Sequence, residues 1–257
     1  MIMKRNLLPI IALALSATAC VSDADLDVAD NKGFINVSVS ADNSMETRGT
    51  VSVSDISNWT IRAHKTGETD DIIWSSGKAF AAGEYTVKAS NYATEEASYQ
   101  ANDKWGAAYY YGSASGITVT AGNTATATID CGKAMNARMK VTIPESDGVL
   151  SNVSLEAKNA TEERTLKFIT ATNEKYAYFK ATETVSYTLK YTYKQDTEKT
   201  ITGTIAMQGA ATENIITVSA NDNGLIDVTI QYDDEFGDGN SSTITIDAAT
   251  GEQVSNS

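Results

Sequence analysis

The stretch Val185-Ser186-Tyr187-Thr188-Leu189-Lys190-Tyr191-Thr192-Tyr193 is the longest run in the chain in which apolar and polar residues alternate. A β-strand points successive side chains to opposite faces of its sheet, so this alternation collects the apolar side chains on one face. Thr in particular suits the solvent-exposed face of a strand. The run therefore predicts a strand with one face in a protein core and the other in water.

The same alternation recurs along the chain from Gly33 onward, and turn-forming residues such as Ala121-Gly122-Asn123 and Asn221-Asp222-Asn223-Gly224 separate the runs. Only residues 92–105, which are acidic and Ala-rich, could hold a short helix or a long loop. Short strands without long helical periods between them favour an all-β sandwich over βαβ units. The other alternating runs are residues 35–41, 59–63, 85–89, 125–131, 137–143, 153–157, 226–232 and 244–246.

A boundary is visible where Gly132-Lys133-Ala134 joins two of these strands. Division at this point gives two blocks of about 100 residues, which is a usual size for one sandwich. The last residues are expected to be frayed. The predicted organisation is a signal peptide at 1–19, a tether at 20–32, an N-terminal sandwich at 33–132, a C-terminal sandwich at 133–248 and a tail at 249–257.

The N-terminus resembles an export signal. Lys4 and Arg5 precede an apolar stretch over residues 7–17, which is shorter than the roughly 20 residues that a membrane-spanning helix needs. The segment ends in Ser16-Ala17-Thr18-Ala19-Cys20, and small residues before a Cys match a bacterial lipoprotein signal. Cys20 would then carry acyl chains that anchor the protein to a membrane. The alternative is an ordinary secretory signal with an incidental Cys.

Composition limits the classes of partner and cofactor. The 257 residues include 20 Lys and Arg against 33 Asp and Glu, giving a net charge of −13, which argues against nucleic acid as a partner. Apolar residues make up 42% of the chain, which is enough for a packed core. Two Cys exclude a disulfide-stapled scaffold, and one His leaves no His-rich metal site. We expect no cofactor and no enzymatic activity, since no acid–base constellation is legible.

Three candidate reactive or metal-binding groups have a simpler structural interpretation. Cys131 falls on the apolar side of its strand, so a buried inert thiol is favoured over a nucleophile. His64 falls on the polar side, which predicts an exposed side chain. Asp233, Asp234 and Asp238 belong to the densest acidic cluster, where a solvated turn is favoured over a weak Ca²⁺ site because the spacing differs from an EF-hand loop.

Aromatic residues offer a candidate glycan site. Trp105 and the outward-facing members of Tyr109, Tyr110 and Tyr111 could stack on sugar rings, and three adjacent Tyr in a strand place at least one ring on each face. Trp59 lies on the apolar side of its strand pattern. Core packing with incidental surface rings is therefore favoured over a sugar platform, and Trp105 with the outward Tyr remains the place to look for one.

The order of several short motifs carries a resemblance to a family. The chain resembles Bacteroides-type surface lipoproteins that carry a domain of unknown function and are related to fimbrillin-like proteins. The resemblance covers about residues 33–246, and Ala108 stands where members often have Pro. The motifs, in order, are Gly33-Phe34-Ile35-Asn36-Val37-Ser38-Val39-Ser40, Thr47-Arg48-Gly49, Ser57-Asn58-Trp59-Thr60-Ile61, Ala82-Gly83-Glu84-Tyr85-Thr86-Val87-Lys88-Ala89, Tyr109-Tyr110-Tyr111-Gly112, Ile117-Thr118-Val119-Thr120-Ala121-Gly122 and Asn136-Ala137-Arg138-Met139-Lys140-Val141.

The resemblance implies two tandem sandwiches of transthyretin-like, Greek-key type. It also implies that the acidic segment after Cys20 directs the lipoprotein to the outer face of the outer membrane. In such fimbrillins a trypsin-like protease cuts after an Arg, here between Arg48 and Gly49, and a strand from a neighbouring subunit replaces the lost strand at 34–41. The alternative is that Arg48 is an exposed loop residue that is never cut. The C-terminal strand at 243–247 is short for a donor, which counts against a stalk subunit and leaves a tip or anchor subunit, or a plain surface protein.

Two functions from different classes follow. The first is a structural or adhesive surface lipoprotein, whose partners are the membrane, through its lipid anchor, and other fimbrial subunits. The second is a glycan-binding lipoprotein of a polysaccharide uptake system. An enzyme such as a glycosidase ranks last.

Overall fold

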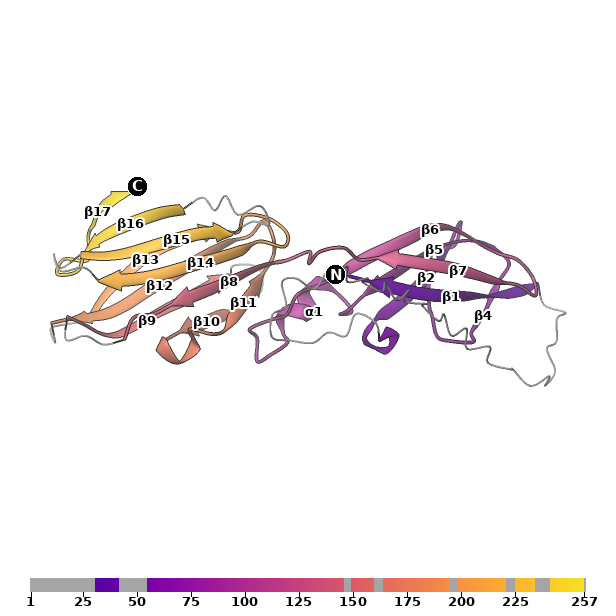
Figure 1. The fold of residues 1–257 in the computed structure, drawn as a ribbon, viewed down its shortest axis with the longest axis horizontal. Helices are drawn as coiled ribbons and strands as arrows, with labels where there is room; N and C mark the ends of the chain where they lie inside the picture. Colours follow the sequence, from indigo (N-terminus) through magenta and orange to yellow (C-terminus); the bar gives the residue numbers. More distant parts are fainter. Residues whose placement is uncertain are drawn as a thin grey trace, which may run out of the picture.

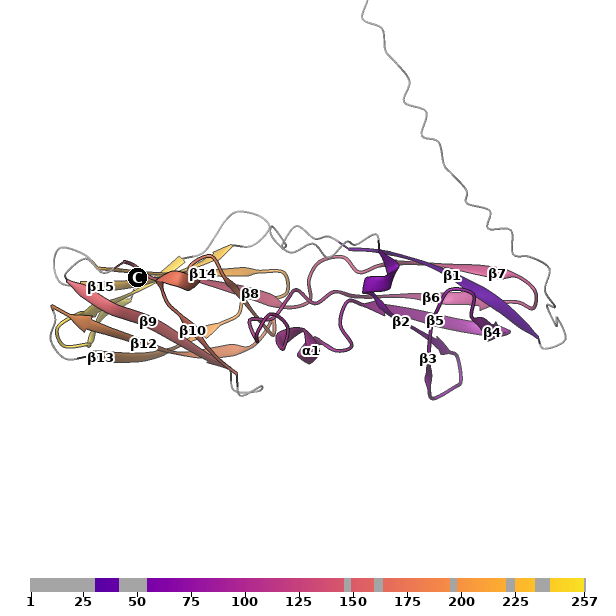
Figure 2. The same ribbon diagram turned by 90° about the horizontal axis from the view of Figure 1, so that it is seen from below.

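The computed structural model describes residues 31–41, 55–145, 149–159, 164–194, 198–220, 225–233 and 241–256. These residues form two strand-rich lobes placed end to end, so the molecule is elongated (Figures 1 and 2). Helical structure in the described chain is limited to the short helix α1 (Glu95–Tyr99) and the 3-10 turns η2 (Ile56–Asn58) and η3 (Thr170–Thr172). The predicted all-β sandwich class is confirmed.

The N-terminal lobe contains a three-stranded sheet in the order β4-β1-β7 and a four-stranded sheet in the order β3-β2-β5-β6. Alternate side chains of the two sheets meet in one core, to which Ile35, Val37, Ile61, Val87 and Ile129 belong. The lobe is therefore a β-sandwich. Its strands are β1 (Lys32–Ser40), β2 (Thr60–Lys65), β3 (Asp71–Ile73), β4 (Ala79–Ala81), β5 (Gly83–Ser90), β6 (Tyr111–Val119) and β7 (Thr124–Asp130).

The C-terminal lobe contains a four-stranded sheet, β10-β9-β12-β13, and a six-stranded sheet, β11-β8-β14-β15-β16-β17. The long alternating run is β12, which pairs with β9 on one side and β13 on the other. Its apolar members Val185, Tyr187, Leu189 and Tyr191 are all buried in the second core, as the period of two predicts. The strands are β8 (Ala137–Thr142), β9 (Leu150–Asn159), β10 (Thr165–Phe168), β11 (Tyr176–Phe179), β12 (Thr184–Tyr193), β13 (Glu198–Ala206), β14 (Glu213–Ala220), β15 (Leu225–Asp233), β16 (Ser241–Asp247) and β17 (Gln253–Asn256).

Two strand pairs in the described sheets are parallel, β1 with β7 and β8 with β14, and every other pair is antiparallel. Antiparallel neighbours can be joined by a tight hairpin, whereas parallel neighbours need a long crossover. Strands β1 and β7 are thus brought together by the whole lobe that lies between them in sequence. The transthyretin-like, Greek-key connection pattern stays a prediction.

Several strands were not predicted from the sequence. β3, β4, β10 and β11 have only three or four residues, which is too few for alternation to be recognised. β13 is an edge strand with many half-exposed residues, so its two faces differ little. The expected fraying of the tail is contradicted by β17, which pairs with β16 at the edge of the six-stranded sheet. The stretch 92–105 holds the short helix α1.

At the junction of the two lobes, each lobe packs an aromatic side chain against the core of the other. Tyr178 of β11 is buried in the core of the N-terminal lobe. In the other direction, Trp105 packs edge-on against Phe168 of the C-terminal core, with ring centroids 5.0 Å apart. Figure 2 places α1 at this junction. Each lobe thus contributes a large side chain to the other, which couples the two sandwiches.

A buried cation strengthens the same junction. Arg164 is only 3% exposed, and its guanidinium donates to the backbone carbonyl oxygens of Tyr99, Lys104 and Tyr178. It also lies 4.7 Å from the ring centroid of Phe179. These charge-assisted hydrogen bonds hold α1 and the following turn against β11.

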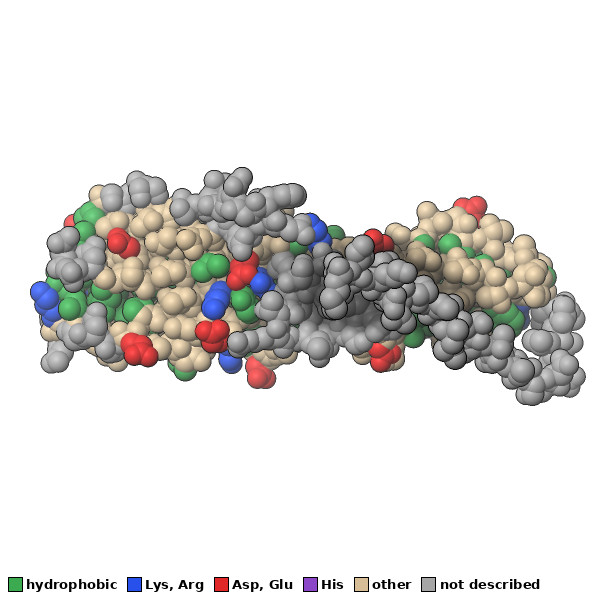
Figure 3. Space-filling model, in the orientation of Figure 1, with side chains coloured by type: hydrophobic (Ala, Val, Ile, Leu, Met, Phe, Trp, Pro, Cys, Tyr) green, Lys and Arg blue, Asp and Glu red, His purple; other side chains and the backbone are tan. Residues whose placement is uncertain are grey.

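The surface shown in Figure 3 differs between the lobes. On this face the N-terminal lobe carries few charged side chains, whereas acidic and basic side chains lie close together on the C-terminal lobe. Among the residues that the structure describes, no helix is long and apolar enough to span a membrane.

Candidate functional site

Strand β1, which contains the strand expected to be exchanged, is the central strand of its sheet. It pairs with β4 over Lys32–Phe34 and with β7 over Phe34–Ser40. Ile35 and Val37 point into the core and are 4% and 6% exposed. The Trp74 indole N–H donates to the Ile35 carbonyl oxygen at 2.8 Å, which ties the opposite sheet to the β1 backbone.

The start of β1 is closely packed against the turn that precedes β7. A Cβ atom added at Gly33 would overlap the Thr120 carbonyl oxygen and lie 2.7 Å from that of Asn123. The Phe34 amide donates to the Asn123 carbonyl oxygen at 2.8 Å. Only glycine fits at position 33 of β1, because the Cβ atom of any other residue would have to displace backbone atoms of the neighbouring turn.

The two processing sites predicted from the sequence, the lipidated Cys20 and the Arg48-Gly49 bond, lie outside the described residues. What the structure does describe is the strand on the N-terminal side of that bond, β1, and the sandwich on its C-terminal side.

The four aromatic candidates separate into two groups. Tyr109 and Tyr111 line one pocket, and Tyr111 is 39% exposed. Tyr110 lies between them in sequence, points to the opposite face and is 1% exposed in the core. Trp105 packs on the C-terminal core, and the Lys175 ammonium lies over its ring in a cation–π contact, 5.1 Å from the ring centroid. The structure thus brings Tyr109 and Tyr111 together and places Trp105 and Tyr110 elsewhere.

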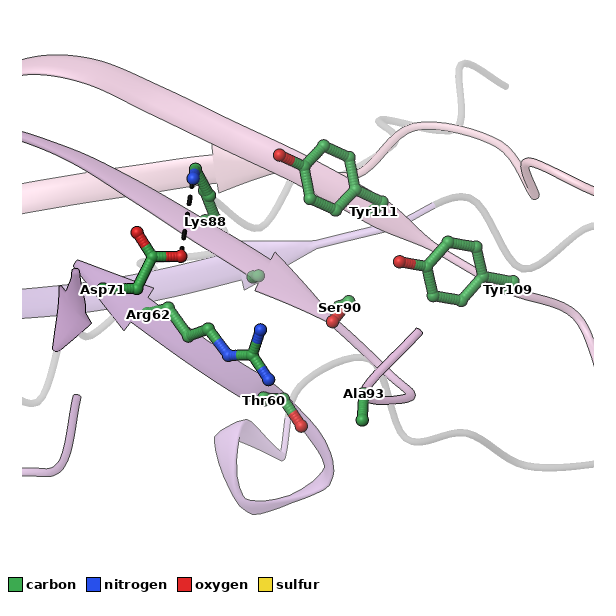
Figure 4. A pocket seen from close by; sticks show the side chains of 9 residues that line it. Thr60, Arg62, Asp71, Lys88, Ser90, Ala93, Tyr109 and Tyr111 are labelled. Atoms are coloured by element: carbon green, nitrogen blue, oxygen red, sulfur yellow. Dashed lines mark hydrogen bonds and ion pairs between the residues drawn. The ribbon is translucent and has the colours of Figure 1, made fainter. Parts of the chain in front are cut away.

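The pocket lies on the solvent face of the β3-β2-β5-β6 sheet and has a volume of about 210 Å³ (Figure 4). Strand register explains how its walls form: Thr60 of β2 lies opposite Ser90 of β5, and Ser90 lies opposite Tyr111 of β6. Two residues along the strands, and so on the same face, Arg62 lies opposite Lys88. Polar side chains from three neighbouring strands therefore meet on one face.

Charges in the pocket are unevenly compensated. The Asp71 carboxylate lies 3.5 Å from Lys88 Nζ and 3.0 Å from His64 Nδ1. Among the residues that the structure describes, the Arg62 side chain has no hydrogen-bond or ion-pair partner. Burial, opposed by a hydrogen bond with Ser90, raises the pKa of the Tyr109 phenol above its ordinary value.

Arg62, Lys88 and Asp71 were not identified as site residues from the sequence. The alternation does assign residues 60, 62 and 64 to the polar side of their strand. It cannot show which residues of β5 and β3 lie opposite them, because register between strands depends on long-range packing. The one available signal was two polar-side cations, Arg62 and Lys88, in neighbouring predicted strands.

The two lone reactive residues lie where the sequence indicated. Cys131 is 4% exposed, and burial together with the nearby Asp130 raises the pKa of its thiol to about 11. The thiolate that a nucleophile requires is therefore strongly disfavoured. His64 is partly exposed and paired with Asp71.

The acidic cluster is largely outside the described chain. The backbone of Asp233 ends strand β15, whereas Asp234 and Asp238 lie outside the described residues. Within the described ranges, no group of three or more His, Cys, Asp or Glu side chains is arranged to hold a metal ion.

The geometry thus defines an all-β protein of two coupled sandwiches with a polar pocket on one sheet. The chain belongs to a family described as a domain of unknown function (DUF4493), whose profile matches residues 23–255. The predicted membership of a family with a domain of unknown function is confirmed. No curated protein matches the chain. Among solved structures, it is similar to a fimbrial assembly protein from Parabacteroides distasonis ATCC 8503, with 11% identity, a TM-score of 0.34, and coverage of 87% of this chain and 97% of that chain.

Proposed function

We propose that this protein is a non-enzymatic surface protein that is exported to the outer membrane as a lipoprotein and acts, once cleavage has released its acylated N-terminal segment, as a structural subunit at the tip or anchor of a fibre. Its assembly proceeds by exchange of strand β1 for a strand of another subunit after cleavage between Arg48 and Gly49. The fimbrillin-like resemblance of the sequence supports this proposal.

The observation that carries the proposal is the position of β1. It is the central strand of a three-stranded sheet, and its long-range partners β4 and β7 are far from it in sequence. Loss of β1 would expose the paired edges of both strands together with the core beneath Ile35 and Val37. An apolar groove flanked by two unpaired strand edges binds an extended strand through main-chain hydrogen bonds and side-chain pockets.

The burial of Ile35 and Val37 gives an estimate of the free energy with which that groove would bind a strand. Burying one Ile or Val side chain stabilises a structure by about 1.5–3 kcal/mol. The two buried side chains of β1 therefore contribute roughly 3–6 kcal/mol before its backbone hydrogen bonds are counted. This is a large share of the about 5–15 kcal/mol that stabilises a typical domain, so an empty groove would strongly favour a replacement strand.

The C-terminal strands bear on which role the subunit plays. β16, which contains the candidate donor, pairs with β15 on one side and β17 on the other. Because both of its edges are occupied, its release would break two strand pairings. This arrangement supports a subunit that receives a strand, such as a tip or anchor, over one that donates its C-terminus.

Limited proteolysis of the folded mature protein tests the exchange. Trypsin is expected to cut after Arg48, and a labelled peptide of residues 31–41 should then replace the original strand. An Arg48→Gln variant serves as the uncut control, and a peptide with Ile35→Asp should not enter the groove. If the cut protein takes up no labelled peptide under conditions that leave the C-terminal lobe folded, the strand-exchange proposal is wrong.

A second candidate function is glycan binding, and the pocket on the β3-β2-β5-β6 sheet is the observation that favours it. Tyr109 and Tyr111 supply two rings on one face, with the Thr60 hydroxyl beside them, whereas the Ser90 hydroxyl already donates to the Tyr92 carbonyl oxygen. Aromatic faces and hydroxyl donors are what sugar rings require. Binding of oligosaccharides by the mature protein, lost on Tyr111→Ala, would support this function, and an array without hits would remove it.

A further inference from the structure

The pocket contains a local conflict that packing does not explain. Arg62 and Lys88 lie directly opposite each other in the antiparallel pair β2–β5. Like charges in that position destabilise a sheet. Since natural sequences generally avoid such conflicts unless a site requires them, the pairing marks this position as functional.

The neighbouring carboxylate compensates only one of the two cations. Asp71 contacts Lys88 at 3.5 Å and His64 at 3.0 Å, whereas the Arg62 side chain has no partner among the described residues. The charged side chains that line the pocket, Arg62, Lys88 and Asp71, carry one net positive charge in a chain whose net charge is −13. That excess matches a singly charged carboxylate better than a doubly charged phosphate group.

The rest of the pocket suits a sugar ring. Figure 4 shows the Arg62 guanidinium extending toward Thr60 and Ser90, with the rings of Tyr109 and Tyr111 beyond Ser90. Glu95 and Glu96 of α1, which act on the Tyr109 phenol, do not line the pocket. Their negative charge disfavours an anion at the Tyr109 end of the pocket, which leaves the Arg62 end for it. The volume of about 210 Å³ is below the roughly 300–1,000 Å³ of pockets for drug-sized ligands, so it suits one sugar unit.

We propose that this pocket binds an acidic sugar, with the carboxylate held by Arg62 beside Lys88 and the sugar ring resting against Tyr109 and Tyr111. This inference rests on the second proposed function, glycan binding at the same pocket, and it names the class of ligand. The planar guanidinium can donate two parallel hydrogen bonds to a carboxylate, which gives both charge and orientation.

Calorimetric titration of the full mature protein tests the inference. The acidic probes are methyl β-D-glucuronoside and N-acetylneuraminic acid, the neutral probe is methyl β-D-glucoside, and acetate tests the carboxylate alone. Arg62→Met should weaken binding of at least one acidic sugar by about tenfold or more, because a charge-assisted pair is lost. Lys167→Met is the matched control, since Lys167 is an exposed cation on β10 of the other lobe and its loss changes the net charge equally.

The outcomes separate the two claims. Acidic-sugar binding that is lost in Arg62→Met, reduced in Tyr111→Ala and unchanged in Lys167→Met supports the inference. Equal binding of the neutral probe, unaffected by Arg62→Met, overturns the carboxylate assignment and leaves glycan binding in place. Acetate binding as tightly as the acidic sugars overturns the role of the two Tyr rings. Failure of every sugar to bind overturns both claims.

Discussion

Shortening one buried side chain of β1 should weaken the packing of the whole strand against the N-terminal core. Ile35 is 4% exposed and packs in the N-terminal core, so Ile35→Ala removes buried methyl and methylene groups and leaves a cavity. Substitutions of this kind cost about 2–5 kcal/mol, and we expect about 3 kcal/mol here. If β1 leaves its groove as a unit, the same change should speed its replacement by about a hundredfold, because each 1.4 kcal/mol is a factor of about ten.

Two measurements check this magnitude. Urea unfolding followed by tryptophan fluorescence gives the loss of stability, and uptake of the labelled 31–41 peptide by the Arg48-cleaved protein gives the exchange rate. Trp74 is a local reporter, because its indole N–H donates to the Ile35 carbonyl oxygen. Ser38→Ala is the matched control on the same strand, since the Ser38 hydroxyl faces solvent and makes one long hydrogen bond of 3.3 Å to Thr128. A loss below about 0.5 kcal/mol for Ile35→Ala, the range of ordinary surface changes, would refute the packing of β1 described above.

Three further predictions concern other parts of the molecule. Arg164→Met leaves three backbone carbonyl oxygens without their charged donor, so chemical denaturation should show a loss of about 3 kcal/mol, against little change for Lys167→Met. The pKa of the Cys131 thiol is raised from 9.0 to about 11, so the thiol should resist iodoacetamide at about pH 8 in the folded chain and react once the chain is unfolded. Because the folded chain holds this proton more tightly than the unfolded chain, the free energy of unfolding should fall as the pH rises from about 9 toward 11. Asp71→Asn removes the carboxylate beside Lys88, so calorimetry should show tighter binding of methyl β-D-glucuronoside, and weaker binding would contradict the charge assignment.

The alternation of the sequence predicted many strands, the edge strand β7 among them, but it missed β14 (Glu213–Ala220), which is paired on both sides. β12 is paired on both sides and packs one face in the core, so apolar residues occupy every second position, at Val185, Tyr187, Leu189 and Tyr191. The short edge strand β3 has few core contacts, and its sequence carries no such period. Fold class was thus predictable from local pattern, whereas the complete strand list was not.

The candidate pocket could be predicted only in part. The parity argument for three adjacent Tyr correctly indicated that they divide between two faces, with Tyr110 inward and Tyr111 outward. Trp105 lies in a turn, where no period constrains its direction, and it packs against the other lobe. Arg62 and Lys88 meet through strand register, which is set by the packing of the whole sandwich and not by neighbouring residues.

The central claim, that β1 is removed during maturation and replaced by another subunit's strand, is tested most directly by the intact mass of the protein recovered from its native outer membrane. The account predicts a chain that begins at Gly49. A mass that begins at acylated Cys20, with β1 still covalently attached, would contradict strand exchange and leave an anchored sandwich protein whose pocket is its functional surface.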